Sequence, residues 1–308
     1  MGKSLDIEVV CVGQAVIDCT TRGIGKDPHG SGKTLAESIT LNFGGDALNQ
    51  SFALARLGRS VSLVCALGRD LAGSAILAEA ERNGIEVSGI SSPDGFVTPV
   101  ADILVQLDGS RSSISSAAST LPGYTPSPEV IRGAKILSLA SLFRAPLDRK
   151  EVIASLIREA KRQGAIVCAD TKLPTFRPLS LSDLTEILPM IDYIFPNDEE
   201  ACYYTGTDNA NDAAAEFLQR GAKHVVIKCG AKGICAADRD GQFALPAVPV
   251  TVVDTTGGGD HFVAGFIDAL LAGSNFRSSC EAGLILAADC ISHLGASKPR
   301  GQEPRPIA

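Results

Sequence analysis

The chain has 308 residues, of which 45% are hydrophobic, and its 28 Lys and Arg against 35 Asp and Glu give a formal net charge of −7 at pH 7. This length and apolar content suffice for one large domain with a single core. The acidic balance, without a cluster of Lys or Arg, argues against nucleic acid as a partner.

Nine cysteines are scattered along the chain without a C-x-x-C pair, which argues against a disulfide scaffold and against a zinc site. We expect them to be small buried side chains in a reducing compartment. No apolar stretch approaches the length that crosses a membrane, and the first residues lack a secretory signal pattern. We therefore expect a cytoplasmic protein without a membrane partner.

Short apolar runs typical of strands alternate with segments of helical pattern. In chain order, the expected elements are strand 7–13, helix 46–58, strand 60–68, helix 72–84, strand 135–141, helix 148–164, strand 165–170, strand 193–197, helix 211–221, strand 224–230, helix 259–273 and helix 278–295. Strands that are apolar throughout are typical of a mostly parallel sheet with helices on both faces. The sequence thus predicts a doubly wound α/β fold.

Two stretches break this alternation. Residues 34–42 and 97–108 alternate apolar and polar side chains, as strands do when one face meets water. The second is followed by Gly109-Ser110 and "RSSISS", a plausible hairpin. We expect a small β-lid, with strands at about 19–43 and 97–118, inserted in a single domain that spans 1–308.

Two glycine-rich stretches are candidates for a phosphate site. "GKT" at 32–34 ends like a phosphate-binding P-loop, but Asp27 stands where that motif needs its first glycine, and no strand precedes it. The better candidate is "DTTGGGD" at 254–260, where Gly257, Gly258 and Gly259 open a helix. Glycine backbone N–H groups and the helix start together form an anion hole. A flexible loop followed by a capping Asp260 explains the same pattern equally well.

The segment from Asp254 to Gly265 resembles the C-terminal signature of the ribokinase-like, or PfkB, family of carbohydrate kinases, D-T-T-G-A-G-D-x-F-x-x-G, with Gly258 in place of Ala. Four more landmarks occur in the family's order: "VGQAVIDC", "GGDALNQSFALARLG", "PNDEEA" and "KCGAKG". The resemblance implies a doubly wound fold whose active site is covered by a β-lid. It also implies transfer of the γ-phosphate of ATP to a sugar hydroxymethyl group.

The resemblance assigns a role to each matching residue. Asp260 would be the general base, and the amides of Gly257, Gly258 and Gly259 would stabilise the phosphoryl charge. The sugar would be bound by Asp18, Gly44, Gly45 and Asn49, with Asp18 at the end of the first strand. The nucleotide would be bound by Asn197, Lys228, Gly230, Gly233 and Thr255.

Two metal sites follow from the same comparison. Asn197 and Glu200 would organise Mg²⁺ through water, although "NDEE" would also make a good helix start. Asp254 and Thr256 would contribute to a possible K⁺ site. Lys228 stands where the family commonly has Thr, and either a phosphate contact or a solvated strand end fits it.

The acceptor is less well specified. A monosaccharide or sugar acid is the preferred class, and a nucleoside is an alternative for which the lid offers only Phe43 and Phe96 as a base shelf. A non-catalytic sugar-binding regulator is a third reading. Lys172, Arg144 and Arg177 would serve an acidic or phosphorylated sugar, or else lie on the surface. The lid strands also suggest a possible homodimer.

Overall fold

The structure, a computed structural model, describes residues 6–24, 35–107, 110–115, 124–174 and 180–296. Its body is an eight-stranded sheet in the order β12-β11-β10-β9-β8-β7-β1-β4. These strands are β1 (Val9–Val12), β4 (Val61–Val64), β7 (Ile136–Leu142), β8 (Ile166–Thr171), β9 (Tyr193–Phe195), β10 (His224–Lys228), β11 (Ile234–Asp238) and β12 (Gly241–Leu245).

The strands from β4 to β10 in this order are all parallel. At the other edge, β11 is antiparallel to β10, and β12 is antiparallel to β11. Every side chain of β1, β4 and β7 is buried, which explains why these runs are apolar without alternation. Because the strands are parallel, their carboxyl ends lie along one edge of the sheet, where ligands bind in open α/β folds.

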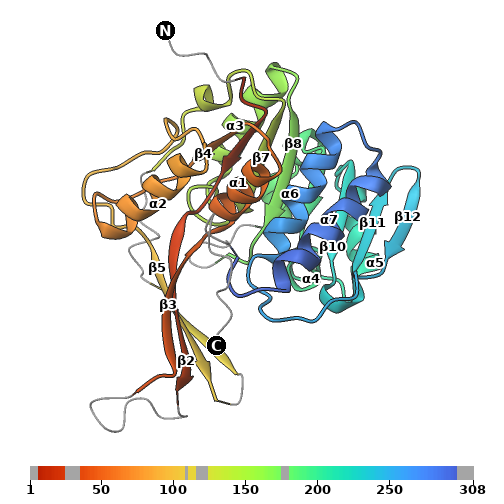
Figure 1. Ribbon diagram of the computed structural model, residues 1–308. Helices are drawn as coiled ribbons and strands as arrows, with labels where there is room; N and C mark the ends of the chain where they lie inside the picture. The colour runs from red at the N-terminus through yellow and green to blue at the C-terminus, as the bar shows by residue number, and fades with distance from the viewer. Residues whose placement is uncertain (1–5, 25–34, 108–109, 116–123, 175–179, 297–308) are drawn as a thin grey trace.

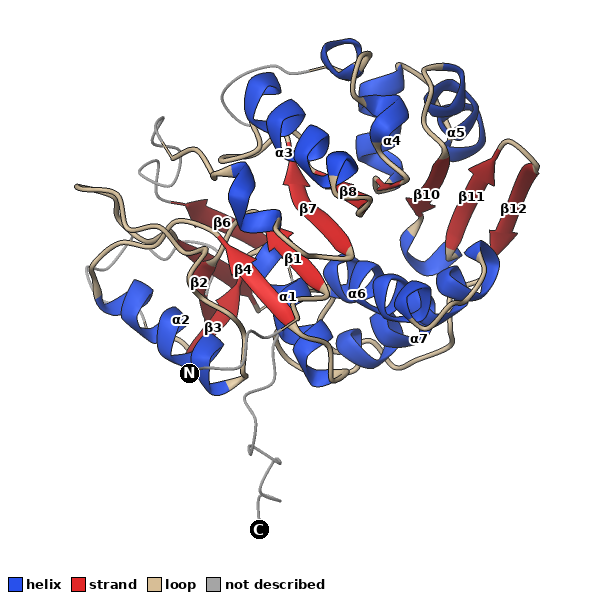
Figure 2. Cartoon of the chain, turned by 90° about the horizontal axis from the view of Figure 1, so that it is seen from above, coloured by secondary structure: helices blue, strands red, loops and turns tan. Residues whose placement is uncertain are grey.

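Helices cover both faces of this sheet (Figure 2). One face carries α1 (Asp46–Arg56), α2 (Leu71–Arg82), α6 (Gly258–Leu271) and α7 (Phe276–Ile291), and the other carries α3 (Lys150–Arg162), α4 (Asp198–Thr205) and α5 (Ala210–Gln219). Short 3₁₀ turns lie at 128–131, 181–184, 188–190 and 230–232. Each layer of helices closes its own hydrophobic cluster, so the doubly wound fold is confirmed.

A second sheet projects from this body (Figure 1). It has four strands in the order β3-β2-β5-β6, namely β2 (Val16–Ile24), β3 (Ser38–Gly44), β5 (Val100–Gln106) and β6 (Arg111–Ser115). We call it the lid sheet. Ile39, Leu41 and Ile114 on its strands are exposed, so apolar side chains of the predicted alternation also face solvent.

The strands and helices predicted from periodicity are all present, with ends shifted by a few residues. The prediction missed β11 and β12, and it gave α4 only as a helix start at "NDEE". It was also wrong about Asp18, which is the third residue of β2 and not the end of the first strand. The chain leaves β1 at Val12, turns, and enters the lid sheet at Val16.

Several expected features lie outside the described residues. They include the P-loop-like stretch 27–34, the hairpin turn at 109, parts of the expected lid and Arg177. Among the described helices, none combines the length and the apolar character that a bilayer crossing requires. The domain boundaries remain a prediction.

Candidate active site

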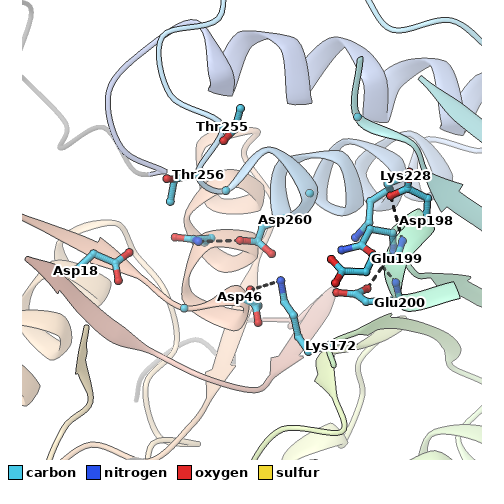
Figure 3. Close-up of a pocket in the computed structure, with 16 residues that line it drawn as sticks. Asp18, Asp46, Lys172, Asp198, Glu199, Glu200, Lys228, Thr255, Thr256 and Asp260 are labelled. Atoms are coloured by element: carbon cyan, nitrogen blue, oxygen red, sulfur yellow. Dashed lines mark hydrogen bonds and ion pairs between the residues drawn. The ribbon is translucent and has the colours of Figure 1, made fainter. Parts of the chain in front are cut away.

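A cavity of about 500 Å³ opens at the carboxyl ends of the parallel strands. The starts of α1 and α6 and strand β2 of the lid sheet complete its walls (Figure 3). Residues expected to be functional that line it are Asp18, Gly45, Asn49, Asn197, Glu200, Lys228, Gly230, Thr255, Thr256, Gly257, Gly259 and Asp260. Gly44, Gly233, Asp254 and Gly258 do not line it, and Asp46, Lys172, Asp198 and Glu199 do.

Asp260 lies in the first turn of α6 and is only 5% exposed. Its Oδ2 accepts a hydrogen bond of 2.7 Å from Nδ2 of Asn49, which lies one turn into α1 and is itself buried. Burial raises the pKa of Asp260 well above its ordinary value, and the nearby Asp46 raises it further. A buried carboxylate of raised pKa is a stronger base than a solvated one, which suits proton abstraction.

The glycine loop, Gly257 to Gly259, forms the N-cap and the first two residues of α6. Gly257 has a φ of 76°, and a Cβ there would come within 2.3 Å of the Cβ of Ala296, so only glycine fits. The N–H of Gly258 donates to the carbonyl of Thr255 at 3.3 Å. The N–H groups of Gly259 and Asp260 have no backbone acceptor among the described residues, as is usual in a first helical turn.

Asp18 projects from the lid sheet into the cavity. A Cβ on Gly44 would come within 2.1 Å of Oδ2 of Asp18, so this glycine makes room for the carboxylate and does not itself reach the cavity. Gly45 has a φ of 94°, and a Cβ there would approach the carbonyl of Gln14 to 2.6 Å. Burial raises the pKa of Asp18 to about 6, with Asp46 adding to the effect.

An ion pair that sequence reasoning missed lies beside Asp260. Lys172, which directly follows β8, places Nζ 3.3 Å from Oδ1 of Asp46, the first residue of α1. Oδ2 of Asp46 accepts a hydrogen bond of 2.6 Å from the Ser141 hydroxyl at the end of β7. Because the two charged residues belong to elements far apart in sequence, no local pattern announces the pair.

Lys228, at the end of β10, is neither solvated nor unpaired. Its Nζ donates to both carboxylate oxygens of Asp170 on β8, at 2.7 and 2.8 Å. Asp170 is 1% exposed, and burial raises its pKa to about 6 although Lys228 acts in the opposite direction. The side chain of Lys228 also lies along the glycine loop, 3.4 Å from where a Cβ of Gly259 would be.

Asn197 and Glu200 form the capping box at the start of α4. Oδ1 of Asn197 accepts from the N–H of Glu200 at 2.7 Å, and Oε2 of Glu200 accepts from the N–H of Asn197 at 3.0 Å and from the Thr171 hydroxyl at 2.8 Å. Asp198 and Glu199 in the same turn line the cavity. This end of the cavity thus carries oxygen groups of the kind that Mg²⁺ prefers.

Among the described residues, no group of three or more His, Cys, Asp or Glu is arranged to hold a metal ion by itself. The carboxylate of Asp254 is engaged within its own loop and by the lid sheet. Oδ1 accepts from the N–H and the hydroxyl of Thr256 at 3.0 and 2.7 Å, and Oδ2 lies 3.7 Å from a guanidinium nitrogen of Arg22 on β2. Arg22 therefore already supplies positive charge where a K⁺ site was expected.

Arg144, whose role the sequence left open, does not line the cavity. Its Nε donates to the carbonyl of Leu173 at 2.6 Å, which ties the loop after β7 to the loop after β8. This partly buried hydrogen bond gives Arg144 a structural role.

Comparison with known proteins places this geometry among sugar and nucleoside kinases. The family model described as "pfkB family carbohydrate kinase" matches residues 6–302. A ribokinase of Haemophilus influenzae is 30% identical over 282 residues, or 88% of this chain and 89% of that protein. A cytidine kinase of Thermococcus kodakarensis is 30% identical over 260 residues, or 82% of this chain and 88% of that protein.

The fold also matches a solved structure. Arabidopsis thaliana ribokinase complexed with ribose and ATP superposes with a TM-score of 0.80 at 25% identity, over 94% of this chain and 94% of that one. The resemblance read from the five sequence motifs is thereby confirmed over nearly the whole chain.

Proposed function

Because this chain belongs to the pfkB family of carbohydrate kinases, and is thus a phosphotransferase with an alcohol group as acceptor, we propose that it transfers the γ-phosphoryl group of ATP to a hydroxymethyl group of a monosaccharide. The observation that carries this proposal is the buried Asp260 beside the glycine loop, in one cavity. ATP is proposed because the similar Arabidopsis ribokinase was solved with it.

The proposed reaction uses two groups of the cavity together, namely the carboxylate of Asp260 and the N–H groups of the glycine loop. Asp260, held by Asn49, accepts the proton of the hydroxymethyl group as its oxygen attacks the phosphorus atom. The N–H groups of the glycine loop and the start of α6 stabilise the negative charge on the transferring phosphoryl. Neither group needs to move far, because both belong to the first turn of one helix.

The acidic residues at the start of α4 fit a magnesium ion held largely by nucleotide phosphates and water. Asp198, Glu199 and Glu200 would bind that water shell, and the ion supplies charge neutralisation on the phosphates. We assign no K⁺ site, since the Asp254 carboxylate is already paired with Arg22.

The charges of the acceptor end favour a neutral sugar over a sugar acid. Asp18, Asp46 and Asp260 line this end, and the ammonium of Lys172 is paired with Asp46. Among the described residues at this end, a substrate carboxylate or phosphate would therefore meet three acidic side chains and one cation, Lys172, that is already paired with Asp46. Hydroxyl groups, in contrast, can donate hydrogen bonds to these carboxylates.

A nucleoside is the second candidate acceptor, favoured by the similarity to a cytidine kinase over 82% of this chain. A nucleobase needs an aromatic shelf, however, and the ring of Phe43 packs edge-on against Phe52 at 6.0 Å in the core. Phe43 is only partly buried by this packing, but neither Phe43 nor Phe96 lines the cavity, which favours the sugar.

The test is an ADP-release screen with neutral sugars, sugar acids, sugar phosphates and nucleosides as acceptors. We expect turnover with a neutral sugar and a loss of roughly 10²–10⁴-fold in kcat for Asp260→Asn. Asp268→Asn is the matched control, because Asp268 lies on the same helix, away from the cavity, and its partner Arg59 can still donate to an amide oxygen. A preference for nucleosides would select the second candidate, and full turnover by Asp260→Asn would remove the base assignment.

A further inference from the structure

A second carboxylate lies next to the base, where the proposed reaction gives it no role. Asp46 begins α1 and Asp260 lies in the first turn of α6, and both side chains point into the same end of the cavity (Figure 3). Their carboxyl groups are close enough for a hydrogen bond when one of them carries a proton. Asp260 is buried and Asp46 partly so, and two such neighbouring carboxylates do not readily ionise together unless a positive charge offsets their repulsion.

Lys172 supplies that charge, and its place is fixed by the fold. Its backbone N–H donates to the carbonyl of Leu142 on β7 at 3.0 Å, and its own carbonyl accepts a hydrogen bond from the hydroxyl of Tyr204 on α4. The side chain, about a third exposed, reaches Asp46 from this anchored position. Ser141 holds the other oxygen of Asp46. The pair is therefore built into three elements of the body.

No other described cation near the base is available for this task. Several titratable groups face Asp260. They are Asp46 from α1, Asp170 from β8, Lys172 directly after β8, Lys228 from β10, Cys290 from α7 and, across the cavity, Asp18 from the lid sheet. Lys228 already donates both to Oδ1 and to Oδ2 of Asp170. Burial raises the pKa of the Cys290 thiol to about 12, so it stays neutral.

We propose that Lys172 and Asp46 are positioning residues for the base: Lys172, by pairing with Asp46, allows both neighbouring carboxylates to be ionised at once and so keeps Asp260 ready to accept a proton. This inference rests on the proposed function, in which Asp260 is the base. Asp46 opposes ionisation of Asp260, and Lys172 favours it. The balance between them sets the pH at which the base becomes active.

The two residues must then act in opposite directions. Without Lys172, two buried carboxylates share one proton more tightly, and the pKa of Asp260 rises further. Without the charge of Asp46, the strongest neighbouring negative charge that opposes ionisation of Asp260 is gone, and the pKa of Asp260 falls. A merely structural ion pair would lower activity in both variants without moving the midpoint of any titration.

The first experiment follows the carboxyl carbons of ¹³C-labelled aspartate by NMR across a pH series in the unliganded protein. Asp260→Asn and Asp46→Asn assign the signals. Lys172→Met should raise the midpoint of Asp260 by about one pH unit or more, Asp46→Asn should lower it by a similar amount, and Lys172→Arg should change it little. Unchanged midpoints would overturn the proposal, and this readout does not depend on turnover.

The second experiment measures the pH profile of kcat/KM with the sugar that the screen identifies. Lys172→Met should lose at least about tenfold at pH 7 and recover much of it at pH 9, because the acidic limb moves upward. Asp46→Asn should move that limb downward, and the double variant should return it toward the original position. A rise in KM alone, with no shift of the limb, would make Lys172 a substrate contact and contradict the proposal.

The outcomes separate the two proposals. A wild-type protein that phosphorylates no acceptor refutes the proposed function, while the NMR midpoints still report the charge coupling. Turnover with unshifted midpoints in both variants refutes only the role of Lys172 and Asp46.

Discussion

Asn49 and Asp260 are 211 positions apart in the sequence, yet Nδ2 of the first lies 2.7 Å from Oδ2 of the second. Both side chains are buried, at 3% and 5% exposure. Since α1 and α6 pack side by side on one face of the sheet, this hydrogen bond exists only in the assembled fold (Figure 1). It fixes one oxygen of the carboxylate, and the other is the oxygen to which we assign the proposed proton transfer.

We expect Asn49→Leu, which keeps the volume and removes the donor, to lower kcat by roughly tenfold to a hundredfold. The lost hydrogen bond favours the ionised form of Asp260, so its removal should also raise the pKa of that group and move the acidic limb of the profile upward. Steady-state kinetics between pH 5 and 9 check both effects. An unchanged kcat would mean that the base is oriented by its helix alone.

Gly257 and Gly273 lie at the two ends of α6 with φ of 76° and 87°, so alanine at either position incurs a similar backbone strain of about 1–2 kcal/mol. A Cβ on Gly273 meets nothing within 4 Å, whereas one on Gly257 overlaps Ala296. Gly257→Ala should therefore lower the melting temperature more and abolish turnover, while Gly273→Ala should stay active. Equal loss of activity in both would argue against a special role for the loop.

Asp18 should reduce stability at neutral pH. Its folded pKa of about 6 exceeds the ordinary value of 3.8, so the folded state binds the proton more tightly. That contribution to stability is complete below about pH 4 and is lost as the pH rises through 6. Asp18→Asn should be more stable than the wild type by roughly 2 kcal/mol at pH 7.5, with little difference near pH 4.

The same variant should bind its acceptor more weakly, with KM raised about tenfold, because charged acceptors make the stronger hydrogen bonds. Thermal unfolding at the two pH values and kinetics measure the two effects. Asp102→Asn, on the neighbouring strand β5 and outside the cavity lining, is the control and should change neither quantity much. A pH-independent difference in stability would contradict the burial of Asp18.

Lys228→Met leaves the Asp170 carboxyl group buried without its partner, which should cost about 3 kcal/mol at pH 8. The cost should shrink at pH 5, where Asp170 takes up a proton. The double variant Asp170→Asn/Lys228→Met should regain most of the stability. If Lys228 also contacts nucleotide phosphates, the KM for ATP stays raised in the double variant, and a normal KM would make the lysine purely structural.

The sequence patterns revealed the parts of this molecule that depend on neighbours in the chain. Buried parallel strands read as continuous apolar runs, and the glycine loop with Asp260 reads as a helix start. The hairpin of β11 and β12 was missed, although Asp240-Gly241 is a turn signal. Helix α4 was predicted only by its start at Asn197, because its eight residues carry too little apolar periodicity.

Such patterns cannot predict which side chains pair when the two residues belong to elements far apart in the sequence. Lys172 meets Asp46, and Lys228 meets Asp170, only because β8 and β10 end, and α1 begins, at one edge of the sheet. Charge alone gave no indication of which of 28 basic residues would be buried. The role of Asn49 toward Asp260 likewise required coordinates, since both residues match motifs that are read separately.

One strand of the lid sheet contacts both the cavity and the loop that precedes the glycines of α6. On β2, Asp18 lines the acceptor end, and Arg22, four positions on and hence on the same face, pairs with Asp254 next to the glycine loop. If the sugar and ATP bind as proposed, a displacement of β2 by one of them would change the binding site of the other. By thermodynamic reciprocity, the sugar and the nucleotide should change each other's affinity by one common factor.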